Sequence, residues 1–232
     1  MKKSNLLLFF FACLFSIAGC KSELVEPALP ADAEQLVFSE IQQATACTNH
    51  YYYDGPERVE IGQVLNDRIV VGFPDGTTAQ QKNRILSQFS FIDSIESSYH
   101  SGSADVAVVL LQPSLSCTQV EKGLRSLGQH PGIRFANPVF NNFQGPWDNG
   151  ITNQIIIAIR PEYSRADLEQ VARRYQVQVV DDFGDNTYVL SVDKRSRVST
   201  LQAMNLIAQH APDKVLSCSP DFLFLPAKNF EL

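Results

Sequence analysis

The chain has 232 residues, with 25 acidic side chains against 19 lysines and arginines and a formal net charge of −6. Its length suits one large domain or two small ones, each with a buried core. A phosphate-binding surface needs clustered basic residues, so the acidic balance excludes nucleic acid as an expected partner.

The amino terminus has the features of an export signal. Met1-Lys2-Lys3 is a positive segment, and the apolar run from Leu6 to Ile17 is too short to span a bilayer. Ile17-Ala18-Gly19-Cys20 resembles the bacterial lipobox, whose cysteine becomes the lipid-bearing first residue of the mature chain. The resemblance implies a signal peptide over residues 1–19 and lipidation of Cys20, with acyl chains as the only contact with the membrane. An uncleaved anchor helix is the alternative.

Three cysteines follow the lipobox, namely Cys47, Cys117 and Cys218. An exported chain meets an oxidising compartment, so at most one internal disulfide is expected, and its pair stays open. Their spacing contains no Cys-x-x-Cys unit, so a zinc site is not expected. We expect neither a metal nor a cofactor.

The segment after the signal predicts a tether and then a hairpin. Residues 20–50 predict a lipidated tether and a short helix: residues 21–30 are polar and contain proline, which is typical of a tether, and residues 31–44 have an apolar helical face. Residues 51–61 place aromatic and β-branched side chains on both sides of an Asp-Gly-Pro turn. This pattern predicts a β-hairpin.

The remaining sequence repeats one pattern twice. A strand over residues 69–73 precedes the helix N-cap Thr78, and a strand over residues 155–159 precedes Ser164 with Asp167. In each copy two strands, a second helix and a proline-containing closing strand follow. Each copy therefore predicts β-α-β-β-α-β, so the expected fold class is α+β with two tandem ferredoxin-like units and antiparallel sheets.

The repeat also predicts the domain boundaries. The amino-terminal hairpin and the first unit should occupy residues 51–143, and the second unit with a carboxyl-terminal tail should occupy residues 152–232. Residues 144–151 are rich in turn formers and predict a linker. The strands are apolar on both faces, so a second layer should cover the helix-free faces. We expect the other copy or the hairpin to do so, with a separate partner protein as the alternative.

The ends of the two copies resemble the prodomains of the subtilisin family. The closing segments 133–140 and 215–222 are similar to a hydrophobic strand that reaches Ala-(Glu/Asn)-Pro-Asn. The opening 69–78 is similar to a prodomain start, and 51–59 is similar to the segment before such modules in secreted subtilisin-like peptidases of Bacteroidetes. Over about residues 51–226, the resemblance implies a folding assistant and inhibitor that packs an open sheet face on the peptidase and lays its tail in the substrate cleft.

In this chain only residues 221–232 follow Pro220, which is too few for a peptidase domain. The expected cleft-binding segment is therefore the tail, an extended peptide that could lie beside a substrate groove. A frayed terminus is the alternative. The expected protein-binding residues are Leu225, Pro226, Phe230, Glu231 and Leu232.

No catalytic residues are expected. The subtilisin signatures Asp-Ser/Thr-Gly, His-Gly-Thr and Gly-Thr-Ser-Met-Ala are absent, and His130 and His210 lie at predicted helix ends, where an imidazolium suits the dipole. The sequence predicts a non-catalytic, lipid-anchored protein-binding module of the cell envelope, at the outer membrane or cell surface. Its partner would be a subtilisin-like peptidase or another envelope protein. A structural or adhesive lipoprotein that keeps the prodomain fold without a peptidase is the alternative.

Lipidation can be tested directly. The substitution Cys20→Ala removes the sulfur that would carry the lipid, so the protein should move from the membrane fraction to the soluble fraction on centrifugation. A variant that still sediments with membranes and resists a salt wash would contradict the lipobox interpretation.

Overall fold

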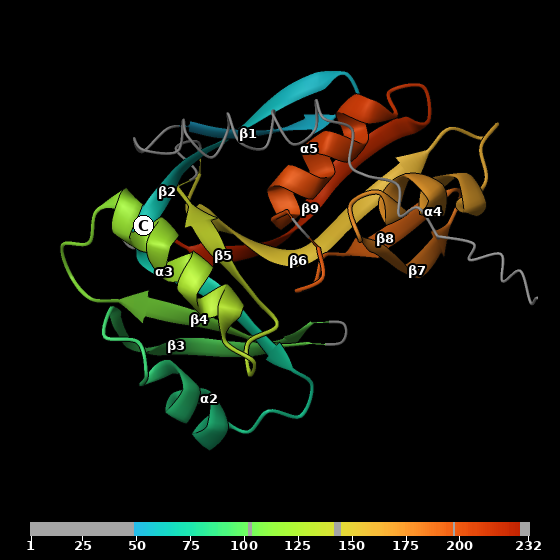
Figure 1. Ribbon diagram of the computed structural model, residues 1–232. Coiled ribbons are helices and arrows are strands. Elements are labelled where there is room, and N and C mark those ends of the chain that lie inside the picture. Colours follow the sequence, from blue (N-terminus) through green and yellow to red (C-terminus); the bar gives the residue numbers. More distant parts are fainter. Residues whose placement is uncertain (1–48, 102–103, 142–144, 197, 228–232) are drawn as a thin grey trace, which may run out of the picture.

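A computed structural model describes residues 49–101, 104–141, 145–196 and 198–227. Within these ranges nine strands form one antiparallel sheet, and four helices pack on it. Figure 1 shows two halves side by side, each with two helices next to its own strands. The predictions for Cys20, Cys47 and the short helix over residues 31–44 lie outside the described residues.

The first half begins with the predicted hairpin, which is confirmed. Gly55 has a φ of 56° at its turn, a conformation that glycine adopts readily. The elements of this half are β1 (Asn49–Asp54), β2 (Glu57–Pro74), α2 (Ala79–Leu86), β3 (Ile92–Ser101), β4 (Ala104–Leu111), α3 (Cys117–Gln129) and β5 (Phe135–Phe140). Its strand order is β5-β2-β4-β3, and all of these neighbours are antiparallel.

The second half repeats the order of elements that follows the hairpin. Its strand order is β9-β6-β8-β7, again antiparallel throughout. The predicted antiparallel α+β class is therefore confirmed. None of the helices in the described ranges has the length and apolar character needed to cross a membrane. The elements are β6 (Trp147–Ile159), α4 (Arg165–Arg173), β7 (Gln178–Gly184), β8 (Thr187–Ser191), α5 (Thr200–His210) and β9 (Val215–Pro226).

Each of the four helices in the described ranges starts with the same local arrangement. A Ser or Thr side chain accepts a hydrogen bond from the backbone N–H three residues later, and the side chain at that position accepts one from the N-cap N–H. This capping box satisfies backbone donors that a helix leaves unpaired, so it fixes where each helix begins. The pairs are Thr78 with Gln81, Ser116 with Gln119, Ser164 with Asp167, and Ser199 with Gln202.

Each half has a core between its sheet and its helices. Alternate residues of β6 and β8 meet α4 and α5 in the second half, including the fully buried Ile155, Ile157 and Leu190. The first half buries Ile69 and Val71 of β2 against α2 and α3 in the same way. Successive strand residues point to opposite faces, so the residues between these must be covered from the other side.

The cover for the first half comes from the second half. Residues 147–151 of β6 pair with residues 222–226 of β9, and we call this two-stranded segment the ribbon. Leu223 and Leu225 of the ribbon pack against Val70 of β2 and its apolar neighbours on the helix-free face. The expectation that the other copy covers this face is thus confirmed for the first half.

The predicted linker over residues 144–151 is therefore wrong from Trp147 onward, because these residues belong to β6. Gly150 in this segment is explained by close packing and not by a turn. A Cβ atom at Gly150 would lie 2.7 Å from Cγ2 of Val70, so only glycine lets β6 pass so close to the first sheet.

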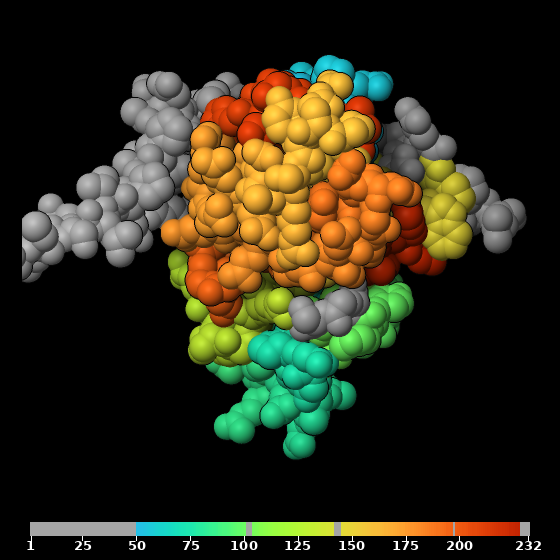
Figure 2. All heavy atoms as spheres, turned by 90° about the vertical axis from the view of Figure 1, so that its right-hand side faces the viewer, coloured from blue at the N-terminus to red at the C-terminus, as the bar shows by residue number. Residues whose placement is uncertain are grey.

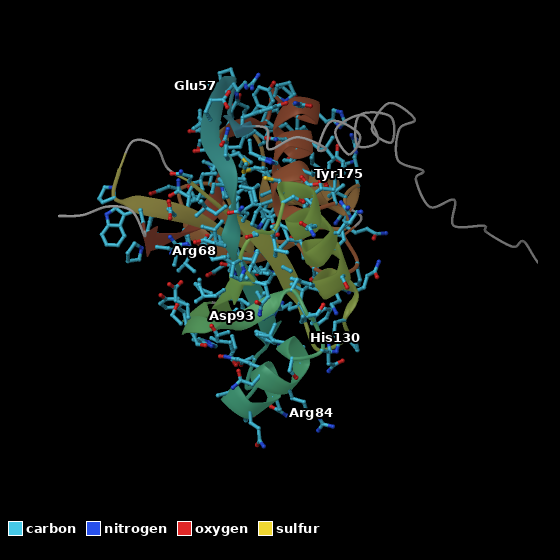
Figure 3. The ribbon with its side chains drawn as sticks, turned by 90° about the vertical axis from the view of Figure 1, so that its left-hand side faces the viewer. Glu57, Arg68, Arg84, Asp93, His130 and Tyr175 are labelled. Carbon is cyan, nitrogen blue, oxygen red and sulfur yellow. The ribbon has the colours of Figure 1, made fainter. Side chains whose placement is uncertain are left out.

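The hairpin is attached to the second half by polar contacts at its backbone. Asn205 of α5, which is 7 % exposed, donates from its amide nitrogen to the carbonyl oxygen of Tyr51 at 3.2 Å. It also accepts from the backbone N–H of Tyr53 at 3.0 Å. Asp54 accepts from the backbone N–H of Cys218 in β9 at 2.8 Å. These bonds hold β1 beside α5 and the hairpin tip, marked by Glu57 in Figure 3, beside β9.

Removal of the Asn205 amide should loosen the hairpin. Asn205→Ala removes both hydrogen bonds from α5 to the backbone of β1, which should lower the free energy of unfolding by about 2–4 kcal/mol. Chemical denaturation measures this loss, and Gln209→Ala on the exposed side of α5 is the matched control. A loss of stability no larger than that of the control would show that the hairpin does not depend on Asn205.

Candidate functional site

The ribbon has one face turned to the first sheet and one turned outward. Partners in an antiparallel pair share a face, so Asp148, Gly150, Leu223 and Leu225 lie on the inner face. The outer face carries Trp147, Phe222 and Phe224, which we call the aromatic ridge.

The aromatic ridge is partly open to solvent. Trp147 is 48 % exposed and Phe224 is 63 % exposed, whereas Phe222 is half-buried with its ring 6.2 Å from that of Tyr52. The flanking Pro146 is exposed as well. Exposed Trp and Phe side chains on a rigid element are typical of protein interfaces, where aromatic residues are enriched.

A buried ion pair fixes the ribbon from below. Arg68 of β2 is 2 % exposed and donates from Nη2 to a carboxylate oxygen of Asp148 at 2.5 Å. The same nitrogen donates to the carbonyl oxygen of Pro226 at 3.0 Å. One side chain of the first half thus holds both strands of the ribbon, and Figure 3 shows Arg68 where β2 passes the ribbon.

The acidic surroundings of Arg68 extend beyond this pair. A carboxylate oxygen of Glu96 lies 3.8 Å from its Nη1, and one of Asp67 lies 4.0 Å from its Nε. A buried guanidinium requires such compensation, because the loss of hydration is costly when a charge is unpaired. This cluster therefore positions the aromatic ridge.

The predicted tail residues have different environments. Leu225 is 2 % exposed and packs in the core between the ribbon and the first sheet, so its side chain is not free to contact a partner in this fold. Pro226 is exposed and ends β9 opposite Trp147. The remaining tail residues Phe230, Glu231 and Leu232 lie outside the described residues.

The second half exposes large apolar side chains on its edge strand. Ile156 and Ala158 of β6 lie on the helix-free face, because their neighbours along the strand form the core, and both are half-buried. On the edge strand β7, Val180 is 47 % exposed and Phe183 is 62 % exposed. Figure 2 shows the second half, in orange, over the upper part of one side of the molecule.

The imidazoles have structural partners. His210, at the predicted end of α5, hydrogen-bonds through Nδ1 to the hydroxyl of Tyr175, which is 2 % exposed. His130, at the end of α3, accepts from the backbone N–H of Gly132 at 3.1 Å. His50 packs against Phe140, and its burial lowers the pKa of its imidazole. Among the hydrogen bonds of the described ranges, none joins an imidazole to a serine or cysteine side chain, as a nucleophile and its base would require.

The fourth imidazole belongs to a charged cluster at the opposite end of the first sheet. Nδ1 of His100 lies 3.7 Å from a carboxylate oxygen of Asp75 and 3.5 Å from one of Asp105. Nζ of Lys82, which is 6 % exposed, lies 3.9 Å from the same Asp105 oxygen. The buried ammonium needs this carboxylate as its counter-charge, so we interpret the cluster as an ion-pair network around Lys82.

The structure distinguishes two of the cysteines. Cys117 is disulfide-bonded, whereas Cys218 is a free and buried thiol. Burial, together with the nearby negative charge of Asp54, raises the pKa of the Cys218 thiol far above its ordinary value. Because a thiolate is the reactive form, burial and the raised pKa favour a packing role for Cys218.

Sequence reasoning missed the residues that build this site. Arg68 and Asp148 are far apart in the chain, and their charges predict exposure when taken singly. The sequence gives only a weak indication of this ion pair. Arg68 directly precedes the apolar run 69–73, and Asp148 lies within a turn-like segment. The turn-forming composition around Trp147 predicts a linker, and it gives no sign that this side chain is exposed on a strand.

Comparisons with known proteins give little further information. No protein-family model matches the chain, and no curated protein matches it. Among solved structures, the chain is similar to the small subunit of acetolactate synthase from Thermotoga maritima, at 12 % identity and a TM-score of 0.27. The match covers 71 % of this chain and 98 % of that chain. A similarity of this size carries no argument about function.

The role of the ion pair can be measured. Asp148→Asn keeps the shape of the side chain but leaves Arg68 without its nearest anion, so the free energy of unfolding should fall by about 3 kcal/mol. Denaturant titration gives this value, with Asp93→Asn on the exposed edge strand β3 as the control. Equal stability of the two variants would contradict the proposed anchoring of the ribbon.

Proposed function

We propose that the chain is a non-catalytic, lipid-anchored protein-binding module. The observation that carries the proposal is the exposure of two large apolar side chains, Val180 and Phe183, on the edge strand β7. Large apolar side chains on an unpaired sheet edge are a feature of surfaces that bind a partner.

We further propose that the two halves are tandem ferredoxin-like units. Each half has the element order β-α-β-β-α-β and places its closing strand beside its opening strand, with the third and second strands following. This order supports the proposal because the ferredoxin-like arrangement is defined by it. The hairpin, the ribbon and the long strands β2 and β6 are additions that connect the units.

The partner that we favour is a subtilisin-like peptidase. In the prodomain arrangement, an open sheet face packs on the peptidase and the tail enters the substrate cleft. The ribbon covers this face in the first half, so the second half is the one that could provide it. The tail would begin after Ala227, close to the aromatic ridge, and Phe230, Glu231 and Leu232 would be its cleft-binding residues.

A lipid on Cys20 would place this module in the cell envelope, at the outer membrane or the cell surface. The residues between the lipid and β1 would act as a tether, which lets the module meet a partner near the membrane. No cofactor or metal is needed for such binding.

A structural or adhesive lipoprotein is the second candidate. One observation favours it: the first sheet is covered by the chain's own ribbon, so that half has no need of a peptidase to complete its layers. A prodomain fold kept without its former partner would have this property.

The inhibitor proposal predicts a separation between binding and inhibition. Residues 21–232 should slow a subtilisin-like peptidase lacking its own prodomain, in proportion to their concentration. Deletion of residues 228–232 should impair inhibition more than binding, because sheet packing provides most of the buried area and the tail alone blocks the cleft. Inhibition kinetics and biosensor binding measure the two quantities.

A surface variant tests the docking face. Phe183→Ser should weaken binding by about tenfold or more, as expected for an interface aromatic residue. The matched control Tyr99→Ser alters a 43 % exposed residue on the edge strand of the first half and should have no effect. If the intact chain binds no such peptidase, the structural or adhesive function is the better account.

A further inference from the structure

The outer edge of β9 has an open stretch of backbone. Ala227 donates from its N–H to the carbonyl oxygen of Pro146. Hydrogen-bonded pairs alternate along an antiparallel ladder, so the backbone groups of Leu225 and Leu223 also point toward β6. The N–H and C=O groups of Phe222 and Phe224 therefore point away from β6. Within the described ranges, no strand pairs with this second edge.

Side chains close this edge at both ends. Asp54 of the hairpin accepts from the N–H of Cys218 at 2.8 Å, and Arg68 donates to the carbonyl oxygen of Pro226 at 3.0 Å. The unpaired stretch lies between these two points and includes Phe222, whose ring packs on Tyr52 of the hairpin, and the exposed Phe224. Its length suits a short extended peptide.

The equivalent edge in the first half shows how a further strand can pair with such a stretch of backbone. Asn141 donates from its N–H to the carbonyl oxygen of Gln63, so the backbone of Phe140 points away from β2. There it pairs with Asn149 of β6 in antiparallel register. Phe140 and Phe222 each lie two residues after the proline of a closing strand. The first closing strand thus carries an added strand at the position where the second has none.

We infer that β9 binds an extended segment of a partner protein as an added antiparallel strand beside Phe222 and Phe224. The inference rests on the proposed tandem units, and it deepens the proposed protein-binding function by giving a mode of recognition. Main-chain hydrogen bonds would supply affinity, as in other cases of strand addition to a sheet edge.

The same comparison defines the chemistry of the bound segment. In the first half the added strand carries the sequence Pro-Trp-Asp-Asn-Gly-Ile over residues 146–151, with the asparagine opposite the phenylalanine and a glycine next to it. Superimposed on β9, the asparagine would pair with Phe222, and the tryptophan would meet the exposed ring of Phe224. We therefore expect an extended segment with a small residue near Phe222 and an aromatic residue near Phe224.

A synthetic peptide of residues 145–153 is the probe. Titrated into the ¹⁵N-labelled chain of residues 21–232, it should bind saturably with a Kd below about 1 mM, the range expected for a short segment. The amide signals of Phe222 and Phe224 should shift most. The same peptide with proline at the position of Asn149 lacks the required N–H and should bind at least tenfold more weakly.

Two variants separate strand addition from simple contact with an aromatic surface. Phe224→Pro removes an outward N–H but keeps the β6–β9 ladder, as the natural Pro226 does at the next equivalent position. Phe224→Ala removes the same ring and keeps the N–H. A loss of peptide affinity at least tenfold larger in Phe224→Pro than in Phe224→Ala, with unfolding temperatures alike, supports the inference. Equal loss in both variants overturns it in favour of an aromatic contact.

Hydrogen exchange of the free chain gives an independent result. The amides of Phe222 and Phe224 should exchange much faster than those of Leu223 and Leu225, and the peptide should slow them. Protection of all four amides in the free monomer would mean that the chain covers its own edge, and protection that grows with protein concentration would assign the edge to a second copy. Either outcome overturns the inference, and neither depends on peptidase inhibition.

Discussion

The buried pair of Arg68 and Asp148 sets the arrangement of the whole molecule. Two charges removed from water are tolerated only when they meet each other and satisfy their remaining hydrogen bonds. Here the second acceptor is the carbonyl oxygen of Pro226, so the guanidinium holds β6 and β9 at once. The ribbon must therefore lie across the first sheet, and its leucines complete the core on that side.

This constraint makes the two halves unequal in how their sheet faces are covered. The first half has helices on one face and the ribbon on the other, so its apolar strands are covered within the chain. The second half has helices on one face, and its edge strand β7 retains the exposed apolar residues Val180 and Phe183. A partner is thus expected to contact the second half, next to the aromatic ridge and the end of β9.

Much of the fold could be predicted because it depends on local chemistry. Strands and helices follow from hydrophobic periodicity, and the start of a helix follows from a capping residue such as Thr78 or Ser164. The ribbon could not be predicted, since Gly150 favours a turn locally and is needed for its close approach to Val70. Asn205 and Asp148 likewise have roles that depend on partners distant in sequence, and no local rule reveals such partners.

The central claim is that the ribbon joins both halves into one cooperative body. Trp147 is the sole tryptophan of the chain and lies on the ribbon, so its fluorescence reports the junction while far-ultraviolet circular dichroism reports all elements. Measured together in denaturant, the two signals should change in a single coincident transition. A fluorescence transition at clearly lower denaturant than the loss of secondary structure would contradict the account, because the ribbon would then detach while both halves remain folded.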